Sequence, residues 1–365
     1  MTIPILGNDI SSSCSKSNDS KDYNYNTGRN RMNRMNNNNS NNDNDNGLLL
    51  LHTVWSNWSK YKKSIYKQLN ISNTEELIDY IKNARITYDN FIDLLRKSIR
   101  DISNSNNIIN DIITSKTASL LPTIITVFDE RYPKRLFNMK NITESIYPPL
   151  ILYVISKYNI NNIMNNDNII AVVGTRQCSD DGKKIAYDIG KALSNKYIIV
   201  TGLAKGIDYH VTLGTLDSKG KVIEVRPYLY PIDYVNEELL NRIITNGCII
   251  SENLKKVNGY NWVAKQLYLR NRIIAGIAKA VVIVEARKGK NSGTMHQVEF
   301  AIKRGKPVFI WKPTSITSNN DEFIDAYKYY VKNNAKGFNN VDELIAMLES
   351  LDHQRPYQQR IDIPY

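Results

Sequence analysis

Apolar runs rich in β-branched residues alternate with helix-length segments through the middle of the chain. The runs are Ile169–Val173, Tyr197–Thr201, Val222–Val225, Cys248–Ser251, Ala280–Glu285 and Pro307–Ile310. Strands that are apolar throughout and separated by helices are typical of parallel sheets covered on both sides. The pattern predicts an α/β domain over residues 119–312, with a mostly parallel sheet and helices on both faces.

Residues 47–118 have a helical pattern. Leu77, Ile78 and Ile81 recur at helical spacing, and Asn73 stands where it can cap the helix that contains them. This predicts a small N-terminal helical domain. Between it and the first regular strand, Ile124–Phe128 and Leu150–Ile155 are interpreted as two further strands.

The two ends of the chain differ in character. Residues 1–46 are polar and of low complexity, with a run from Asn36 to Asn46 that is almost entirely Asn and Asp. Such a segment cannot bury enough apolar surface to fold, so we expect a disordered tail. Within residues 313–365, the segments Asp321–Lys332 and Val341–Leu351 are predicted to form amphipathic helices, followed by a polar tail.

Composition excludes several classes of protein. Apolar residues make up 42% of the chain, which is enough for a core, yet no apolar run approaches the roughly 20 residues of a membrane-spanning helix. No secretory signal is recognisable, so a cytoplasmic location without membrane contact is expected. Three cysteines, Cys14, Cys178 and Cys248, without a CxxC pair predict neither disulfides nor a metal site.

The positive charge is concentrated in one segment. The whole chain has a net charge of +12, and between Lys255 and Lys312 there are 13 basic residues against two acidic ones. Clustered positive charge raises the affinity for polyanions, chiefly nucleic acid. A solvated surface is the alternative for any basic segment, so the motifs nearby decide its meaning.

Three small-residue motifs directly follow predicted strands. They are Gly174-Thr175-Arg176, Gly202-Leu203-Ala204-Lys205-Gly206-Ile207-Asp208 and Ser292-Gly293-Thr294. The carboxyl ends of parallel strands border the binding crevice of an open sheet, and helix N-termini there present N–H groups to anions. Glycine allows close approach to a phosphate, and an arginine can bind it with two hydrogen bonds. Together the motifs predict a phosphate-binding pocket.

A fourth motif, which is rich in basic residues, precedes an apolar helical segment. It runs from Lys265 to Gly276 and contains Arg270-Asn271-Arg272. We expect these three residues to stand near the N-terminus of the following helix, where the helix dipole opposes cations. They are therefore expected to face an anionic ligand or a buried carboxylate such as Asp208 or Glu285.

Common cofactor motifs are absent. The first loop, Gly174-Thr175-Arg176-Gln177-Cys178, lacks the second glycine of GxGxxG, and the second strand ends in Thr201 where a dinucleotide site needs an acid. The phosphate-loop motif GxxxxGK[ST] does not occur either. No cofactor is predicted.

These motifs occur in an order and at spacings that resemble the DNA processing protein A family, also called DprA/Smf, across about residues 124–311. The resemblance rests on the segments Ile124-Ile125-Thr126, Tyr132-Pro133, Pro148-Pro149-Leu150, Val173-Gly174-Thr175-Arg176, Thr201–Asp208, Arg270–Gly276, Val284-Glu285-Ala286 and Ser292-Gly293-Thr294. Leu267-Tyr268 stands where the family usually has Phe-Pro, and the Asn-rich tail is unlike the family.

The resemblance implies an extended Rossmann-like fold that binds single-stranded DNA without catalysis, often as a homodimer, and transfers the strand to a RecA-type recombinase during DNA uptake and recombination. By position, it implies that Gly174, Thr175, Arg176, Gly202, Lys205, Gly206, Lys265, Arg270, Asn271 and Arg272 form the DNA pocket. The third small-residue motif adds Ser292, Gly293 and Thr294 to the predicted phosphate-binding residues. Asp208 and Glu285 are expected to orient it. Trp262 and Tyr268 are candidates for stacking on bases or for packing within the fold.

Two other functions remain open. A nucleoside-monophosphate phosphoribohydrolase of the same superfamily would need a catalytic carboxylate two or three residues after its Gly-Thr, whereas Glu299 lies five residues after Thr294. A sensor that binds a mononucleotide in the same crevice agrees with all the glycine loops. The clustered charge favours a polymer with several phosphates over a mononucleotide.

Overall fold

The protein is described by a computed structural model. It describes residues 50–98, 120–137, 148–232, 236–287, 293–313 and 321–353, apart from residues 53, 56–57, 84, 258 and 304. The predicted disordered tail at 1–46 lies outside the described residues. No helix in the described part of the chain is both long enough and apolar enough to span a bilayer.

Helices precede the sheet, which confirms the predicted N-terminal helical region. In the described part of the chain they include α3 (Trp58–Leu69), α4 (Thr74–Lys82) and α5 (Tyr88–Ser98). The side chain of Asn73 accepts a hydrogen bond from the Glu76 backbone N–H, which caps α4 as its sequence predicts. Leu77, Ile78 and Ile81 are buried on the inner face of the same helix. Helices and sheet belong to one compact unit that begins at Leu49.

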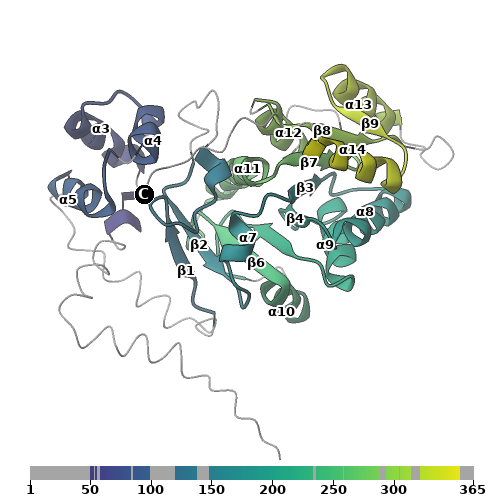
Figure 1. The fold of residues 1–365 in the computed structure, drawn as a ribbon, viewed down its shortest axis with the longest axis horizontal. Helices are drawn as coiled ribbons and strands as arrows, with labels where there is room; N and C mark the ends of the chain where they lie inside the picture. Colours follow the sequence, from purple (N-terminus) through teal and green to yellow (C-terminus); the bar gives the residue numbers. More distant parts are fainter. Residues whose placement is uncertain are drawn as a thin grey trace, which may run out of the picture. The chain divides into compact units, whose positions relative to one another are not determined.

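A nine-stranded sheet forms the centre of the fold, in the order β1-β2-β6-β5-β4-β3-β7-β8-β9 (Figure 1). From β6 to β9 in this order, neighbouring strands are parallel. At the other edge, β2 pairs in antiparallel fashion with both β6 and β1. This confirms the predicted mostly parallel α/β fold. The strands are β1 (Thr123–Thr126), β2 (Ile151–Ile155), β3 (Ile169–Val173), β4 (Ile198–Thr201), β5 (Val222–Val225), β6 (Gly247–Ser251), β7 (Ala280–Ile283), β8 (Val308–Trp311) and β9 (Lys336–Phe338).

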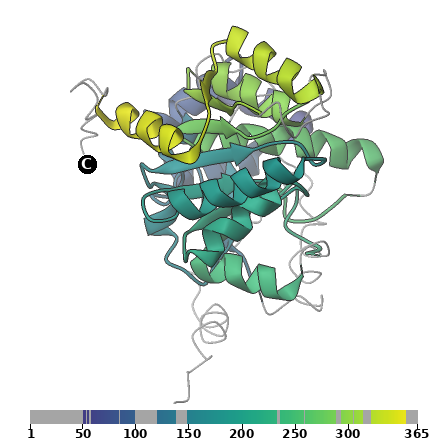
Figure 2. The same cartoon turned by 90° about the vertical axis from the view of Figure 1, so that its right-hand side faces the viewer.

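Helices cover both faces of the sheet, as Figures 1 and 2 show. Ile170 and Val172 of β3 belong to the core under α8, α9 and α14, whereas their neighbours Ile169 and Ala171 belong to the core under α11, α12 and α13. Successive side chains of a strand point to opposite faces, so an all-apolar strand supplies both cores. The helices are α7 (Asn161–Met164), α8 (Asp180–Leu193), α9 (Ile207–Asp217), α10 (Glu237–Asn246), α11 (Tyr260–Ile277), α12 (Gly293–Lys303), α13 (Asp321–Lys332) and α14 (Val341–His353), with a short 3₁₀ helix at Lys134–Phe137.

The sheet continues past residue 312, where the sequence analysis ended the α/β domain. Strand β9 pairs in parallel with β8, and it connects α13 to α14, the two helices that the sequence predicts in this region. Phe338 of β9 and Leu344 and Leu348 of α14 complete the core that begins at β3. The boundary at 312 therefore cuts through one continuous sheet.

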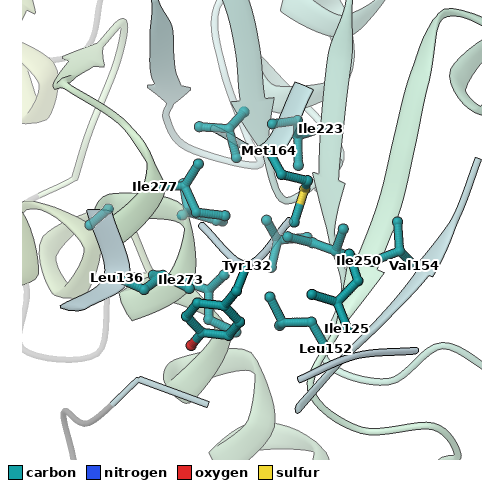
Figure 3. Close-up of a cluster of buried hydrophobic side chains, with 14 of the residues drawn as sticks. Ile125, Tyr132, Leu136, Leu152, Val154, Met164, Ile223, Ile250, Ile273 and Ile277 are labelled. Atoms are coloured by element: carbon teal, nitrogen blue, oxygen red, sulfur yellow. The ribbon is translucent and has the colours of Figure 1, made fainter. Parts of the chain in front are cut away.

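The segment before β2 packs against helix α11. Figure 3 shows Tyr132, Leu136, Ile273 and Ile277 among the side chains of one buried cluster. The Tyr132 hydroxyl donates a hydrogen bond of 2.6 Å to the backbone carbonyl of Pro149, so the one polar atom of this buried ring has a partner. Tyr132 and Leu136 thus join the segment before β2 to the C-terminal half of α11 through apolar packing.

The order of the strands reverses between β3 and β7. From β3 the chain continues through β4, β5 and β6 on one side, and then through β7, β8 and β9 on the other. At such a point the loops after neighbouring strands turn away from each other and leave a crevice at the carboxyl ends of the strands. The first two small-residue motifs follow β3 and β4 at this edge.

Candidate functional site

Two adjoining cavities lie at the carboxyl edge of the sheet. The first has a volume of about 720 Å³ and is lined by residues of the first loop, of α11 and of the start of α12. The second, of about 690 Å³, lies between the Gly202–Gly206 loop, α11 and the segment after β5. Arg176, Ala204, Leu267 and Arg270 line both cavities. The two cavities therefore form one groove, which we call the strand-end groove.

The first loop is held tightly against its neighbours. The Thr175 N–H donates to the Glu285 carbonyl at 2.7 Å, and a Cβ atom on Gly174 would lie 2.4 Å from Cγ1 of Ile207. Only glycine fits at that distance. The neighbouring Arg176 is exposed and lines both cavities, so its guanidinium is available to a ligand.

The second loop depends on two glycines. A Cβ on Gly202 would lie 1.8 Å from Nη1 of Arg270, and Gly206 has a φ of +86° with Thr175 O only 2.4 Å from an added Cβ. The absent side chains allow this loop to touch both the first loop and Arg270. Lys205, between the two glycines, is exposed and lines the second cavity.

Arg270 lies inside the protein, beneath the floor of the groove, and only 6% of its surface is exposed. Its Nη1 donates to the carbonyls of Gly202 and Val225, at 2.7 Å each. The carboxylate of Asp208, also buried, accepts from the Gly202 N–H at 3.2 Å. Burial raises the pKa of Asp208, and the charge of Arg270 opposes that rise. The pair fixes the second loop from below.

Asn271 connects two helices through side-chain amides. It accepts a hydrogen bond of 3.0 Å from Nε2 of Gln297, and its own amide lies 3.4 Å from the carbonyl of Gly293. Asn271, Gln297 and Thr294 are each at least nine-tenths buried, and all three line the first cavity. The amide contacts hold the start of α12 beside α11.

Arg272 points away from the groove. Its guanidinium forms two hydrogen bonds with the carboxylate of Glu252, at 2.7 and 2.6 Å, and both side chains are buried. It lines neither cavity. Residues two apart in a helix point about 200° apart, which separates Arg272 from Arg270. The prediction that Arg270-Asn271-Arg272 stands near a helix N-terminus is wrong, because α11 begins at Tyr260, ten residues before Arg270.

The other predicted residues have different surroundings. Gly293 and Thr294 begin α12 and line the first cavity, while Ser292 lies outside the described residues. Lys265 is exposed on α11 but lines neither cavity. The sequence motif therefore combines residues of the groove with residues that belong to other surfaces.

Glu285 connects the first loop to helix α8. Its carboxylate accepts hydrogen bonds from the backbone N–H of Ser179 at 2.9 Å and from the Ser179 hydroxyl at 2.5 Å. The same hydroxyl oxygen accepts from the Gly182 N–H and so caps α8. Burial raises the pKa of Glu285, and its hydrogen bonds with Ser179 oppose that rise. Glu285 therefore holds the first loop and the start of α8 together beside the groove.

Aromatic rings line both cavities. Tyr268 lies in the first, packed edge-to-face against His296 at 4.7 Å between ring centroids. Trp262 lines neither cavity and packs against Tyr228, which lines the second together with Tyr209. The sequence does not mark Tyr228 and Tyr209 as site residues, because an isolated tyrosine outside a motif has no recognisable signal.

Part of the clustered positive charge is used inside the fold. Besides Arg270 and Arg272, Lys279 donates to Oδ1 of Asn168 at 3.1 Å, and Lys306 donates to the carbonyl of Gly276 at 2.6 Å. Arg287 lines the first cavity and lies 3.6 Å from a carboxylate oxygen of Glu322. The basic segment therefore offers fewer cations to a ligand than its composition predicts.

Within the residues that the structure describes, no group of His, Cys, Asp and Glu side chains is arranged to hold a metal ion. Cys178 is partly buried and Cys248 is fully buried. The groove therefore offers cations, amides, backbone N–H groups and aromatic rings.

Comparison with known proteins gives consistent matches. The model of the family described as DNA recombination-mediator protein A matches residues 123–349. The DNA processing protein DprA of Streptococcus pneumoniae is 29% identical over 268 residues, which cover 70% of this chain and 88% of that protein. The DNA processing protein DprA of Bacillus subtilis is 27% identical over 190 residues, 51% of this chain and 59% of that protein.

Two solved structures are similar in fold. The X-ray structure of DprA from Streptococcus pneumoniae aligns with a TM-score of 0.54 and 23% identity, covering 78% of this chain and 92% of that one. A structure of DNA processing protein A from Helicobacter pylori, described for its single-stranded DNA binding mode, aligns with a TM-score of 0.50 and 24% identity, over 62% of this chain and 96% of that one.

Proposed function

Because the chain belongs to the DNA recombination-mediator protein A family, we propose that it binds single-stranded DNA in the strand-end groove. The observation that carries the proposal is the groove itself. Two cavities of about 720 and 690 Å³ adjoin at the switch point of the sheet and share Arg176. A single cavity suits a mononucleotide, whereas two adjoining cavities with a common cation suit consecutive nucleotides of a strand.

Phosphates are bound at the rim of the groove. Arg176 and Lys205 come from two loops, and both are exposed beside the cavities. Arginine binds a phosphate through its planar fork, and lysine acts as a point charge. Neither contact depends on the base, so the proposed binding is independent of sequence and weakens with salt.

Bases lie against the apolar wall of the second cavity. Leu203, Leu267 and Val263 line it together with Tyr209 and Tyr228. Aromatic rings stack with any base, and each stacked base contributes about 1–3 kcal/mol. The Leu267 side chain stands where the family usually has an aromatic residue, so the tyrosines take the larger part in stacking.

Arg270 acts as a positioning residue in this proposal. Its Nη1 is hydrogen-bonded to two backbone carbonyls, and its charge faces Asp208. The guanidinium therefore holds the Gly202–Gly206 loop in the position from which Lys205 contacts a phosphate. Arg272, paired with Glu252, has no part in binding.

The family resemblance supports the wider role that we propose. The chain protects exposed or incoming single strands in the cytoplasm and transfers them to a RecA-type recombinase, and it acts as a homodimer without catalysing a reaction. His296 packs edge-to-face on Tyr268, and we assign it no chemical step.

Equilibrium titration of labelled oligo-dT, a matched duplex and dTMP tests the proposal. At low salt, the wild type is expected to bind oligo-dT most tightly, and Arg176→Ala to weaken that binding about tenfold or more. Lys191→Ala is the matched control, because it removes an exposed cation at the far end of α8. Equal affinity for dTMP and oligo-dT would contradict the proposal and support a nucleotide sensor instead.

A further inference from the structure

Helix α3 presents a row of lysines on one exposed face. Lys60, Lys63 and Lys67 are all exposed, and their spacing of three and four residues places them above one another on the helix. The opposite face carries Trp58, Ile65 and Tyr66, which are buried. The buried face attaches the helix to its neighbours, so the lysine row, as we call these three residues, is not needed for packing.

The fold does not neutralise this row. Helix α3 contains no acidic residue, and none of the three lysines forms an ion pair with any acid in the described part of the chain. Like charges at these spacings destabilise a helix by about 0.2–0.5 kcal/mol per pair. A row of like charges that costs stability and forms no ion pair within the described residues has the character of a binding surface.

The geometry suits a flexible polyanion. The helix rises about 1.5 Å per residue, so the row extends over on the order of 10 Å. Lysine is a mobile point charge that contacts a phosphate without fixing its orientation. Tyr61, half-buried beside the row, lies under the ammonium group of Lys60 at 5.1 Å from its ring centroid. Electrostatic complementarity therefore favours a phosphodiester backbone that passes over the row.

We propose that the lysine row of α3 is a second, sequence-independent contact for the same DNA strand that the strand-end groove binds. The inference rests on the proposed function of the groove. A strand too short to reach both surfaces gains nothing from the row, whereas a long strand gains affinity because its second contact is intramolecular. The row thus extends the length of DNA that one molecule covers.

Two oligonucleotides separate this role from that of the groove. One is oligo-dT of about 8 nucleotides, within the roughly 4–16 nucleotides that a compact domain binds, and the other is oligo-dT of about 40 nucleotides. The variant Lys60→Gln/Lys63→Gln/Lys67→Gln removes the row and keeps good helix formers. The control Lys191→Gln/Lys328→Gln/Lys332→Gln removes the same charge from other exposed positions.

The row variant is expected to bind the long strand about tenfold more weakly than the wild type, and the short strand equally well. Its log–log salt dependence on the long strand becomes shallower by about 0.7 for each phosphate that the row no longer neutralises. The control keeps both affinities within about twofold, and circular dichroism melting checks that the row variant folds.

Three results would overturn the proposal. The first is unchanged binding of the long strand, and the second is an equal weakening in the control, which would indicate net charge alone. The third is a row variant that binds DNA like the wild type but no longer binds phosphatidylserine vesicles that the wild type binds, which would assign the row to a membrane surface. Failure of the groove is distinguishable, because then the wild type itself would not bind the short strand.

Discussion

At the scale of residues, two arginines of one motif have separate roles. Arg270 is hydrogen-bonded to the carbonyl of Gly202 beneath the groove, and Arg272 is paired with Glu252 in the core. Their side chains leave the same helix on different faces, so their neighbours differ although the sequence places them two residues apart. Arg176, an exposed cation that lines both cavities, comes from another loop.

The contact between Gly202 and Arg270 predicts the effect of a single methyl group. Gly202→Ala places Cβ at 1.8 Å from Nη1, so Arg270 or the loop must move. We expect stability to fall by about 1–3 kcal/mol and oligo-dT to bind more weakly. Urea denaturation and titration of the same sample measure both. Gly293→Ala is the control for stability, because its added Cβ meets no atom within 4 Å.

The buried pair of Arg272 and Glu252 predicts an asymmetric pattern of stabilities. Arg272→Met alone leaves an unpaired buried carboxylate, which costs about 3–5 kcal/mol. Arg272→Met with Glu252→Leu removes both charges, and we expect most of the loss to be recovered. Denaturant unfolding of the three proteins tests this. If the double variant were as unstable as the single one, the unpaired carboxylate would not be the cause of the loss, and the pair itself would stabilise the fold.

At the scale of elements, the strongly periodic segments were predicted well. β3 and α13 have the predicted bounds, Ile169–Val173 and Asp321–Lys332, because long apolar or amphipathic patterns leave few alternatives. β9 was missed because Lys336-Gly337-Phe338 is three residues long and mostly polar. The start of α11 was misplaced because its first turns, from Tyr260, carry no recognisable cap, and Gly259 precedes them with a φ of +129°.

The segment before α3 makes a titratable contact with strand β2. The imidazole of His52 is hydrogen-bonded to the Tyr153 hydroxyl, and burial lowers the pKa of His52 to about 4 from an ordinary value of 6.5. The folded state therefore favours the neutral ring, and the unfolded state binds the proton more readily below pH 6.5. Stability is fully present above pH 6.5 and is lost as the pH falls towards 4, by at most about 3 kcal/mol.

Denaturant unfolding between pH 7.5 and 4.5 measures this loss. His52→Gln keeps a polar group but does not titrate, so its free energy of unfolding is expected to fall less over the same interval. If wild type and variant lost equal stability on acidification, the pH dependence would belong to other groups.

At the scale of the whole molecule, the sequence predicted which loops meet, but it did not predict the partners of the charged side chains. The loops after β3 and β4 were expected to meet because both follow strands of one parallel sheet, and they do line one groove. The partners of each charge could not be predicted, since Arg272, Lys279 and Lys306 lie within the most basic segment and are bonded inside the fold. A charge count does not distinguish an internal cation from one that faces solvent.

The strand order also explains why two cavities adjoin at this edge of the sheet. The switch point between β3 and β7 opens a crevice, and the Gly202–Gly206 loop after β4 extends it towards the segment that follows β5. Two adjoining cavities result, and Arg176 lies between them. The proposed function therefore predicts that a single strand occupies both cavities.

Ultraviolet cross-linking of oligo-dT of about 8 nucleotides, followed by mass spectrometry of the linked peptides, locates the bound strand on the protein. Cross-links are expected in the loops and helix of the groove, at residues 174–177, 202–209, 227–228 and 263–268, and we expect Arg176→Ala to lose them. Cross-links confined to other surfaces, unchanged in that variant, would contradict the proposed function.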